Sequence, residues 1–90
     1  MDKHQNYKDL ISDGQYDEAM TVLNCMIGED PTDDRALFDR GKLKWRLGDR
    51  AGAMSDYSKA TGLNPDSPAA MALEQARDIA GFFNPDLYNP

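Results

Sequence analysis

The sequence predicts an all-α protein of five helices, in which two helical hairpins are followed by one further helix. Leu, Ala and Met outnumber the β-branched residues, and this balance favours helices over strands. The chain also matches itself when it is shifted by 34 residues, as expected for a repeated helical unit. No stretch alternates apolar and polar residues over the length that a strand needs.

Six identical residue pairs carry the internal repeat. They are Gly14 with Gly48, Ala19 with Ala53, Met20 with Met54, Gly28 with Gly62, Pro31 with Pro65, and Ala36 with Ala70. Glycine suits the turn between two helices because a positive φ costs it little. Alanine lets two helices cross closely, and proline cannot continue a helix interior. The identities therefore fall where a stacked hairpin needs a turn, a close crossing or an ending.

The expected helices occupy residues 3–12, 16–28, 33–47, 50–62 and 67–82. The second helix carries an apolar stripe at helical spacing between Tyr16 and Ile27, and the fourth carries its counterpart between Ala53 and Leu63. Connections of only a few residues predict that neighbouring helices pack antiparallel.

Capping residues are expected at two helix starts. Thr32 precedes the acidic first turn of the third helix. Ser67 precedes Pro68, and proline is favoured at the first position of a helix.

The spacing of these residues resembles that of the tetratricopeptide-repeat (TPR) family, and the resemblance covers nearly the whole chain. The second unit shows it most clearly, through Leu37, Gly41, Gly48, Asp49, Ala53, Tyr57, Ala60, Leu63, Asn64 and Pro65. The first unit keeps Gly14, Tyr16, Ala19, Leu23 and Pro31. The family shares an architecture rather than a chemistry, so the resemblance predicts the fold more narrowly than the function.

Two departures from the family pattern affect the ends of the stack. Tyr7 stands where the family prefers a small residue, which leaves the first helix loosely determined. Glu74, Gln75 and Asp78 stand where the family usually has small or apolar residues. Polar residues there suit a capping helix, whose outer face meets water.

The resemblance implies a right-handed α-solenoid of two TPR hairpins plus a C-terminal capping helix. It divides the chain into a single TPR domain at 1–83 and an aromatic C-terminal tail at 84–90. Within the domain, repeat 1 is expected at about 1–33, repeat 2 at about 34–67 and the capping helix at about 67–83.

Charge is distributed unevenly along the chain. The protein has a net charge of −6, yet residues 35–50 hold six basic and two acidic side chains. The acidic balance argues against a protein that binds duplex nucleic acid, because such a protein needs a basic surface. No apolar run approaches the length of a membrane span, and the N-terminus lacks the apolar core of a signal peptide. We therefore expect a cytoplasmic protein with neither a nucleic-acid nor a membrane partner.

The residue inventory does not support catalysis. His4 is the only histidine and lies near the N-terminus, so a serine or cysteine nucleophile would lack a well-placed base. The acids near Pro31 lack the spacing of a calcium loop, and there is no glycine-rich phosphate loop. We expect no enzyme activity, no cofactor and no metal. The single cysteine, Cys25, lies among apolar residues and is expected to be buried as a small hydrophobe.

The family resemblance places partner binding on a concave face formed by the first helix of each hairpin. The residues expected on this face are Lys8, Arg35, Phe38, Asp39, Lys42, Trp45 and Arg46. Arg35, Lys42 and Arg46 would form a stripe suited to a partner protein or peptide, particularly an acidic one. The alternative is a solvated helix face, with Trp45 filling the core. A complete carboxylate clamp is not expected, because a third hairpin is absent.

The C-terminal segment supplies a second candidate interface, with Phe82, Leu87 and Tyr88 as large apolar residues that need cover. The segment either folds back and completes the core or recognises a partner or a second copy of the chain. The main functional hypothesis is a non-catalytic adaptor that acts through the concave face. The alternative is a structural or assembly subunit that self-associates, or docks one fixed partner, through the last helix and tail. We expect a monomer or a weak homodimer.

Overall fold

Five α-helices follow one another along the described part of the chain. The computed structural model describes residues 3–82 and, within them, the side chains of residues 6–78. The helices are α1 (Lys3–Ser12), α2 (Tyr16–Glu29), α3 (Asp34–Arg46), α4 (Arg50–Leu63) and α5 (Pro68–Phe82). The predicted all-α architecture of five helices is confirmed, and each predicted boundary lies within one residue of the observed one.

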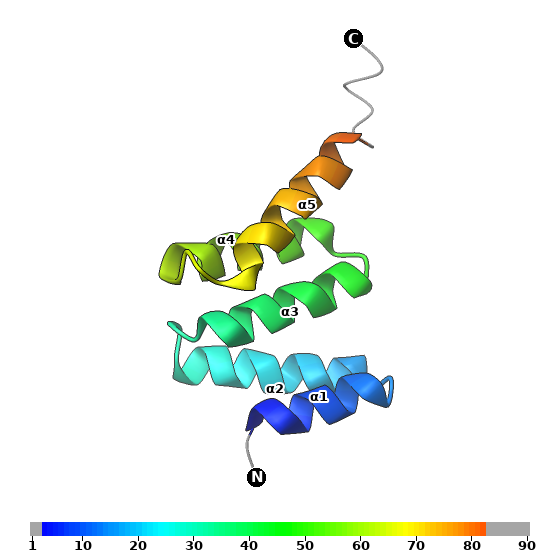
Figure 1. Ribbon diagram of the computed structural model, residues 1–90. Coiled ribbons are helices and arrows are strands. Elements are labelled where there is room, and N and C mark those ends of the chain that lie inside the picture. The colour runs from blue at the N-terminus through cyan, green and yellow to red at the C-terminus, as the bar shows by residue number, and fades with distance from the viewer. Residues whose placement is uncertain (1–2, 83–90) are drawn as a thin grey trace.

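The helices form antiparallel pairs that stack one on another (Figure 1). Each helix packs mainly on its neighbours in sequence: α1 on α2, α2 on α3, α3 on α4, and α4 on α5. The helix α3 therefore lies in the middle of the stack. The C-terminal half of α5 extends beyond the other helices (Figure 1).

The turns within the two hairpins have the same geometry at equivalent positions. Gly14 and Gly48 have φ angles of +80° and +93°, in the region that favours glycine. Each glycine amide donates to the carbonyl three residues earlier, and the following amide donates to the carbonyl five residues before it. This pair of bonds is the Schellman arrangement, which satisfies carbonyls at a helix end. The predicted role of the two glycines is confirmed.

The start of α3 differs from the prediction. Its cap is Asp33, whose Oδ1 accepts a hydrogen bond from a backbone amide of the first turn at 3.0 Å. Thr32 instead donates its hydroxyl to Oδ1 of Asp30 at 2.6 Å. The cap of α5 is as predicted, since Oγ of Ser67 accepts the amide hydrogen of Ala69 at 3.1 Å.

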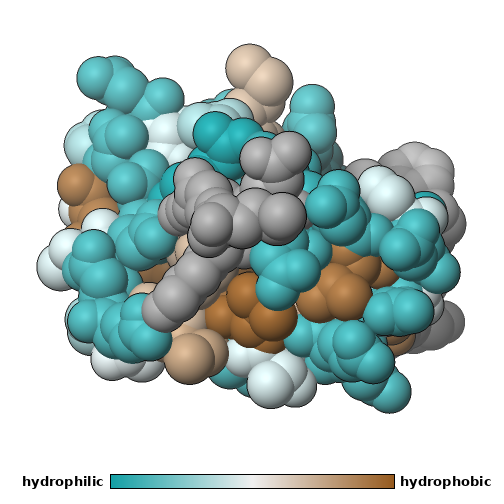
Figure 2. Space-filling view, turned by 90° about the horizontal axis from the view of Figure 1, so that it is seen from below, coloured by the Kyte–Doolittle hydropathy of each residue, from teal (hydrophilic) through white to brown (hydrophobic). Residues whose placement is uncertain are grey.

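The core consists of two apolar clusters that meet at Ile27, which packs against both. The first lies between α1, α2 and α3 and contains Tyr7, Ala19, Leu23, Met26, Ala36 and Leu43. The second lies between α3, α4 and α5 and contains Leu37, Ala53, Tyr57, Ala60, Ala69 and Leu73. Seen from the α1 end of the stack, an apolar strip lies within a largely hydrophilic surface (Figure 2). Ala19 and Ala53 are fully buried, as expected of small residues at helix crossings.

Cys25 is exposed, so the prediction of a buried thiol is wrong. Its neighbours on α2, Leu23 and Met26, are buried, but Cys25 is turned away from Leu23 by two helical steps of about 100° each. Its Sγ atom lies 3.7 Å from Oε1 of Glu29, one turn further along. A residue that stands among apolar residues in the sequence therefore need not share their face of the helix, and Cys25 does not.

Gly41 marks a close approach of α3 and α4. A Cβ atom on this residue would lie 2.6 Å from Cε1 of Tyr57 and 3.2 Å from the carbonyl oxygen of Ala53. The ring of Tyr57 is buried and packs against Phe38, with ring centroids 5.9 Å apart, so it has little room to move. The missing side chain at Gly41 is therefore what allows the two helices to pack at this distance.

We expect Gly41→Ala to lower the free energy of unfolding by about 1–3 kcal/mol, because the added methyl group overpacks the α3–α4 contact. Denaturant unfolding of the two proteins measures the difference. Gly28→Ala is the matched control, since a Cβ at this exposed position of α2 meets no atom within 4 Å. Removing a helical glycine there is neutral or stabilises by up to about 1 kcal/mol. Equal losses in the two variants would contradict the packing argument.

Candidate functional site

The residues predicted to bind a partner line two adjoining grooves. The cationic groove, between α1 and α3, has a volume of about 630 Å³ and includes Lys8, Arg35, Asp39, Lys42, Trp45 and Arg46. The apolar groove, between α3 and α5, has a volume of about 340 Å³ and includes Phe38, Lys42, Trp45, Met71 and Ala72. Lys42 and Trp45 line both, so the two grooves share a wall. The structure thus brings all seven predicted residues to the same side of α3.

The register of α3 explains this placement. Lys42 follows Arg35 by seven residues and precedes Arg46 by four, so the three bases lie on one helix face. Arg40 and Lys44 are also four residues apart, but they lie on a different face of the same helix. The basic segment of the sequence is therefore divided between two sides of α3.

The bases of the cationic groove are accessible to solvent. The side chains of Arg35 and Lys42 are 59% and 57% exposed. The guanidinium carbon of Arg46 lies 5.3 Å from the ring centroid of Tyr16, and Nζ of Lys42 lies 4.9 Å from that of Phe38. Such cation–π contacts hold a base in place without neutralising its charge. These bases can therefore still attract an anionic ligand.

Asp39 forms the floor of the cationic groove. It is only 4% exposed and accepts a hydrogen bond from the hydroxyl of Tyr7. Its carboxylate also lies 3.4 Å from Nε of Arg35 and 3.8 Å from Nζ of Lys42. A buried carboxylate between two exposed bases orients them and reduces the positive charge of the groove. Asp39 therefore acts on the groove through these bases, and its predicted place on the concave face does not give it an exposed carboxylate.

Tyr7 corrects the expectation that α1 is loosely determined. It is only 1% exposed, its ring belongs to the first apolar cluster, and its hydroxyl reaches Asp39 on α3. It also lines the cationic groove. Sequence reasoning treated Tyr7 only as a departure from the family pattern. The contact that it missed is the pairing of a large ring on α1 with a carboxylate on α3, two helices later.

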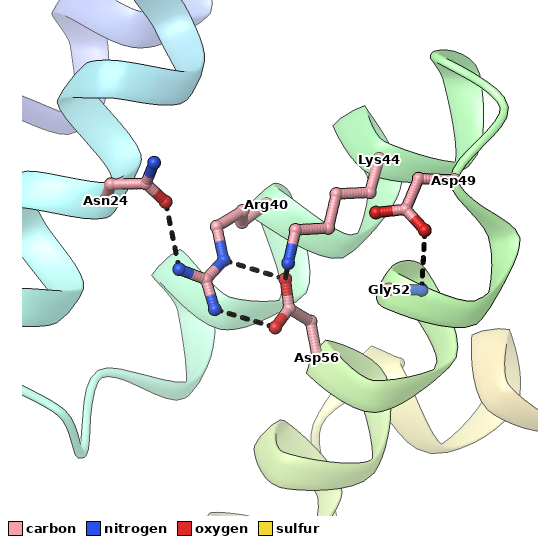
Figure 3. Close-up of polar contacts among 6 residues, drawn as sticks. All are labelled: Asn24, Arg40, Lys44, Asp49, Gly52 and Asp56. Carbon is pink, nitrogen blue, oxygen red and sulfur yellow. Dashed lines mark hydrogen bonds and ion pairs between the residues drawn. The ribbon is translucent and has the colours of Figure 1, made fainter.

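Two bases of α3 point away from the grooves, toward a buried carboxylate on α4 (Figure 3). Asp56 is 1% exposed, and Arg40 donates from Nε and Nη2 to its two oxygens, both at 2.8 Å. Nζ of Lys44 lies 3.2 Å from Oδ2 of Asp56. Arg40 also donates from Nη1 to Asn24 on α2 at 2.9 Å. The network joins α2, α3 and α4, and it engages two of the six bases in residues 35–50.

Trp45 combines the two interpretations that the sequence left open. It is partly buried and packs against the second apolar cluster, yet it also lines both grooves. The guanidinium carbon of Arg50 lies 5.0 Å from its ring centroid. Trp45 is therefore an aromatic wall fixed by the core on one side and accessible on the other.

The second predicted interface cannot be placed on this surface. Leu87 and Tyr88 lie outside the described residues, and the side chain of Phe82, at the end of α5, is also outside them. Among the side chains that the structure describes, no group of three or more His, Cys, Asp or Glu is arranged to hold a metal ion. None of the described helices has the length and apolar character of a membrane-spanning helix.

We expect Tyr7→Phe to lower the free energy of unfolding by about 1.5–3 kcal/mol, because the buried carboxylate of Asp39 loses a hydrogen bond. Denaturant unfolding measures the change. Tyr16→Phe removes the same hydroxyl from a half-buried ring and should be close to neutral. A neutral Tyr7→Phe variant would show that the hydroxyl does not stabilise the α1–α3 contact.

Acid should weaken the Asp56 network. Burial raises the pKa of the Asp56 carboxyl, but the hydrogen bonds from Arg40 and Lys44 lower it by more, so this pKa lies below its ordinary value. Ionised Asp56 therefore stabilises the fold above its unfolded pKa of about 3.9, and this contribution is lost as the pH falls through the lower folded pKa. Arg40 and Lys44 stay protonated throughout this range.

We therefore expect Asp56→Asn to reduce the free energy of unfolding by about 3 kcal/mol or more at neutral pH, because it leaves two bases without their buried partner. The variant should also lose less stability than the original protein as the pH is lowered from about 4. Thermal unfolding at a series of pH values measures both effects. Parallel pH profiles for the two proteins would contradict the assignment of this acid dependence to Asp56.

Comparison with known proteins agrees with the fold. Residues 34–67 match the tetratricopeptide repeat family. Over 60 residues, or 67% of this chain, the sequence is 40% identical to the peptidyl-prolyl cis-trans isomerase FKBP42 of Arabidopsis thaliana, but the match spans only 16% of that protein. The structure resembles the solution NMR structure of Bacteroides fragilis protein BF1650, with a TM-score of 0.84 and 37% identity over 99% of this chain and 91% of that one. The chain is therefore a small protein that contains a tetratricopeptide repeat.

Proposed function

We propose that this protein is a non-catalytic adaptor that binds an acidic partner protein or peptide across the cationic and apolar grooves. A tetratricopeptide repeat is generally a protein–protein interaction module, and residues 34–67 match one. The observation that supports an acidic partner is the composition of the cationic groove. Lys8, Arg35, Lys42 and Arg46 meet there, and Asp39, the one acid among the described residues that line it, is buried.

The charge distribution gives the groove selectivity. The whole protein carries a net charge of −6, so an acidic partner is repelled by most of the surface and attracted mainly to this face. The guanidinium groups of Arg35 and Arg46 can donate two parallel hydrogen bonds to one carboxylate, whereas Lys8 and Lys42 act as point charges. An extended acidic segment could therefore contact several bases in turn.

The apolar groove supplies the second part of the recognition. Exposed ion pairs contribute only about 0.2–1 kcal/mol each, so four accessible bases alone would bind weakly and in a salt-dependent manner. Phe38, Trp45 and Met71 present apolar surface directly beside them. A partner that carries an apolar side chain next to its acidic residues would contact both grooves at once.

The proposal is tested by NMR titration of the full chain with a short capped peptide in which Glu residues flank one Leu and one Phe. We expect the amide resonances of the groove residues and the indole resonance of Trp45 to shift. A peptide with Gln in place of Glu should bind more weakly, and the response to the acidic peptide should decline as salt is added. Arg35→Glu combined with Arg46→Glu should abolish the response, because repulsion replaces attraction at both ends of the stripe.

The matched control combines Lys59→Glu with Arg77→Glu. These bases are exposed on α4 and α5, line neither groove, and their reversal changes the net charge by the same amount. Loss of the response in the control as well would point to net charge rather than to a groove. Unchanged binding in the Arg35 and Arg46 variant would remove the cationic groove from the proposal.

A further inference from the structure

The last helix, α5, carries an exposed face whose counterpart on α3 is buried. The face of α3 that lies 34 residues earlier packs on α4 and includes Leu37, which is 3% exposed. Met71 has the equivalent position on α5 and is 66% exposed. Glu74 and Asp78 follow Met71 by three and seven residues, so they share its face, and both are exposed. We call Met71, Glu74 and Asp78 the acidic stripe of α5.

The acidic stripe is accessible to a partner. Leu73 and Ala76, on the opposite side of α5, are buried, so the stripe points away from the core. Neither Glu74 nor Asp78 forms an ion pair with another side chain within the described residues 6–78. The C-terminal half of α5, which carries Asp78, also extends beyond the other helices (Figure 1). The stripe can therefore contact a surface that supplies bases and an apolar side chain.

The cationic groove is such a surface, since Lys8, Lys42 and Arg46 line it beside the accessible ring of Trp45. We propose that the acidic stripe of one copy docks in the cationic groove of a second copy. The stripe does not reach the groove of its own chain, because the buried face of α5 packs on α4 and directs the stripe outward. One chain thus presents two complementary surfaces that only another chain can bring together.

The spacing of residues on the two helices fits an antiparallel contact. Trp45 follows Lys42 by three residues on α3, and Met71 precedes Glu74 by three residues on α5. When the two helices run in opposite directions, Met71 therefore lies level with Trp45 while Glu74 lies level with Lys42. The apolar side chain meets the aromatic ring, and the acid meets the base.

The same alignment also provides a base for Asp78. This residue lies three residues, or about 4.5 Å along the helix axis, from the level of Arg35. The long side chain of Arg35 is 59% exposed and can span that distance. A parallel alignment would instead place Met71 level with Asp39, whose buried carboxylate is a poor contact for an apolar side chain. The antiparallel arrangement is therefore the one that we propose.

Docking of a second copy rests on the cationic groove of the proposed function but needs no external partner. A second copy and an acidic peptide would compete for Lys42 and Trp45. The association between copies should be weak, because exposed ion pairs contribute little each and every copy carries a net charge of −6. It therefore matters at high protein concentration, and peptide binding in dilute solution does not depend on it.

Sedimentation equilibrium of the full chain, at concentrations up to about 1 mM, tests the association. We expect the mean mass to rise with concentration. Glu74→Lys combined with Asp78→Lys should abolish the rise, although this α5 variant has a net charge of −2 and so less general repulsion. A constant monomer mass for the original protein, or a rise that the α5 variant retains, would overturn the proposal.

The matched control combines Asp13→Lys with Asp66→Lys. These acids are exposed, lie outside the stripe, line neither groove, and their reversal changes the net charge by the same amount. The control should associate at least as strongly as the original protein. Loss of association in the control as well would show that the stripe has no special part in the contact.

A mixture of complementary variants identifies the two surfaces. Lys8→Glu combined with Arg46→Glu reverses two groove bases and leaves Arg35 and Lys42 beside Asp39. This groove variant keeps its stripe, and the α5 variant keeps its groove. Neither should associate alone, whereas an equimolar mixture should form a complex. A mixture that stays monomeric would contradict the assignment of stripe to groove.

A second measurement does not need the groove variant. The indole N–H resonance of Trp45, the only tryptophan, reports on the groove of the ¹⁵N-labelled α5 variant. Unlabelled original protein should shift this resonance, because it supplies a stripe, and unlabelled α5 variant should not. Original protein that carries Met71→Ser should shift it less. Equal shifts from all three unlabelled proteins would overturn the proposal.

These outcomes separate second-copy docking from the adaptor proposal. If the original protein stays monomeric but an acidic peptide shifts the groove resonances, second-copy docking fails and the adaptor proposal stands. If the copies associate through stripe and groove but the peptide gives no response, the adaptor proposal fails alone.

Discussion

The burial of the Asp56 carboxylate constrains the rest of the structure. A charge that is 1% exposed destabilises a fold by several kcal/mol unless it is paired and hydrogen-bonded. Arg40 satisfies both carboxylate oxygens, and Lys44 adds a third contact from the next turn of α3. The rotation of α3 about its own axis is therefore set by the need to aim these two bases at α4. Once it is set, the bases at positions 35, 42 and 46 must lie on a different face, where they form the cationic groove.

The same helix itself carries the second buried carboxylate, Asp39, on its other side. Asp39 accepts a hydrogen bond from the hydroxyl of Tyr7 on α1. The helix α3 is therefore connected to α1 through Asp39 and to α4 through Asp56. Between them, Gly41 lets the ring of Tyr57 approach the α3 backbone. Asp39, Arg40 and Gly41 are consecutive residues of α3, so polar and apolar contacts to three different helices start within one helical turn. A short stack with few repeats has little apolar surface to bury, so directional contacts of this kind help to fix the relative positions of its helices.

Sequence reasoning located what depends on local chemistry and missed what depends on partners far along the chain. The boundaries of all five helices followed from glycine, proline and the 34-residue repeat, because these residues act on the backbone where they stand. Cys25 was misplaced because apolar neighbours in sequence face different directions on a helix. Tyr7 and Asp39 are 32 residues apart, and neither residue alone indicates a buried hydrogen bond. Six of the seven predicted groove residues lie on α3 and could be placed on one side of it because a helical register is periodic, whereas Lys8 lies on α1. The burial of Asp39 depends on a second helix whose position the register does not give.

The shared wall between the two grooves has a consequence for binding strength. Each exposed base contributes little by itself, and Asp39 already offsets part of the charge of Arg35 and Lys42. An anion that binds at Lys42 therefore gains less binding free energy than it would from an unpaired lysine. The difference is made up only if the ligand also displaces water from the apolar surface beside Lys42. Because Trp45 and Lys42 belong to both grooves, the polar and apolar contributions can be made by adjacent residues of one ligand. Such an arrangement favours a segment with a particular order of acidic and apolar residues over one that merely carries negative charge.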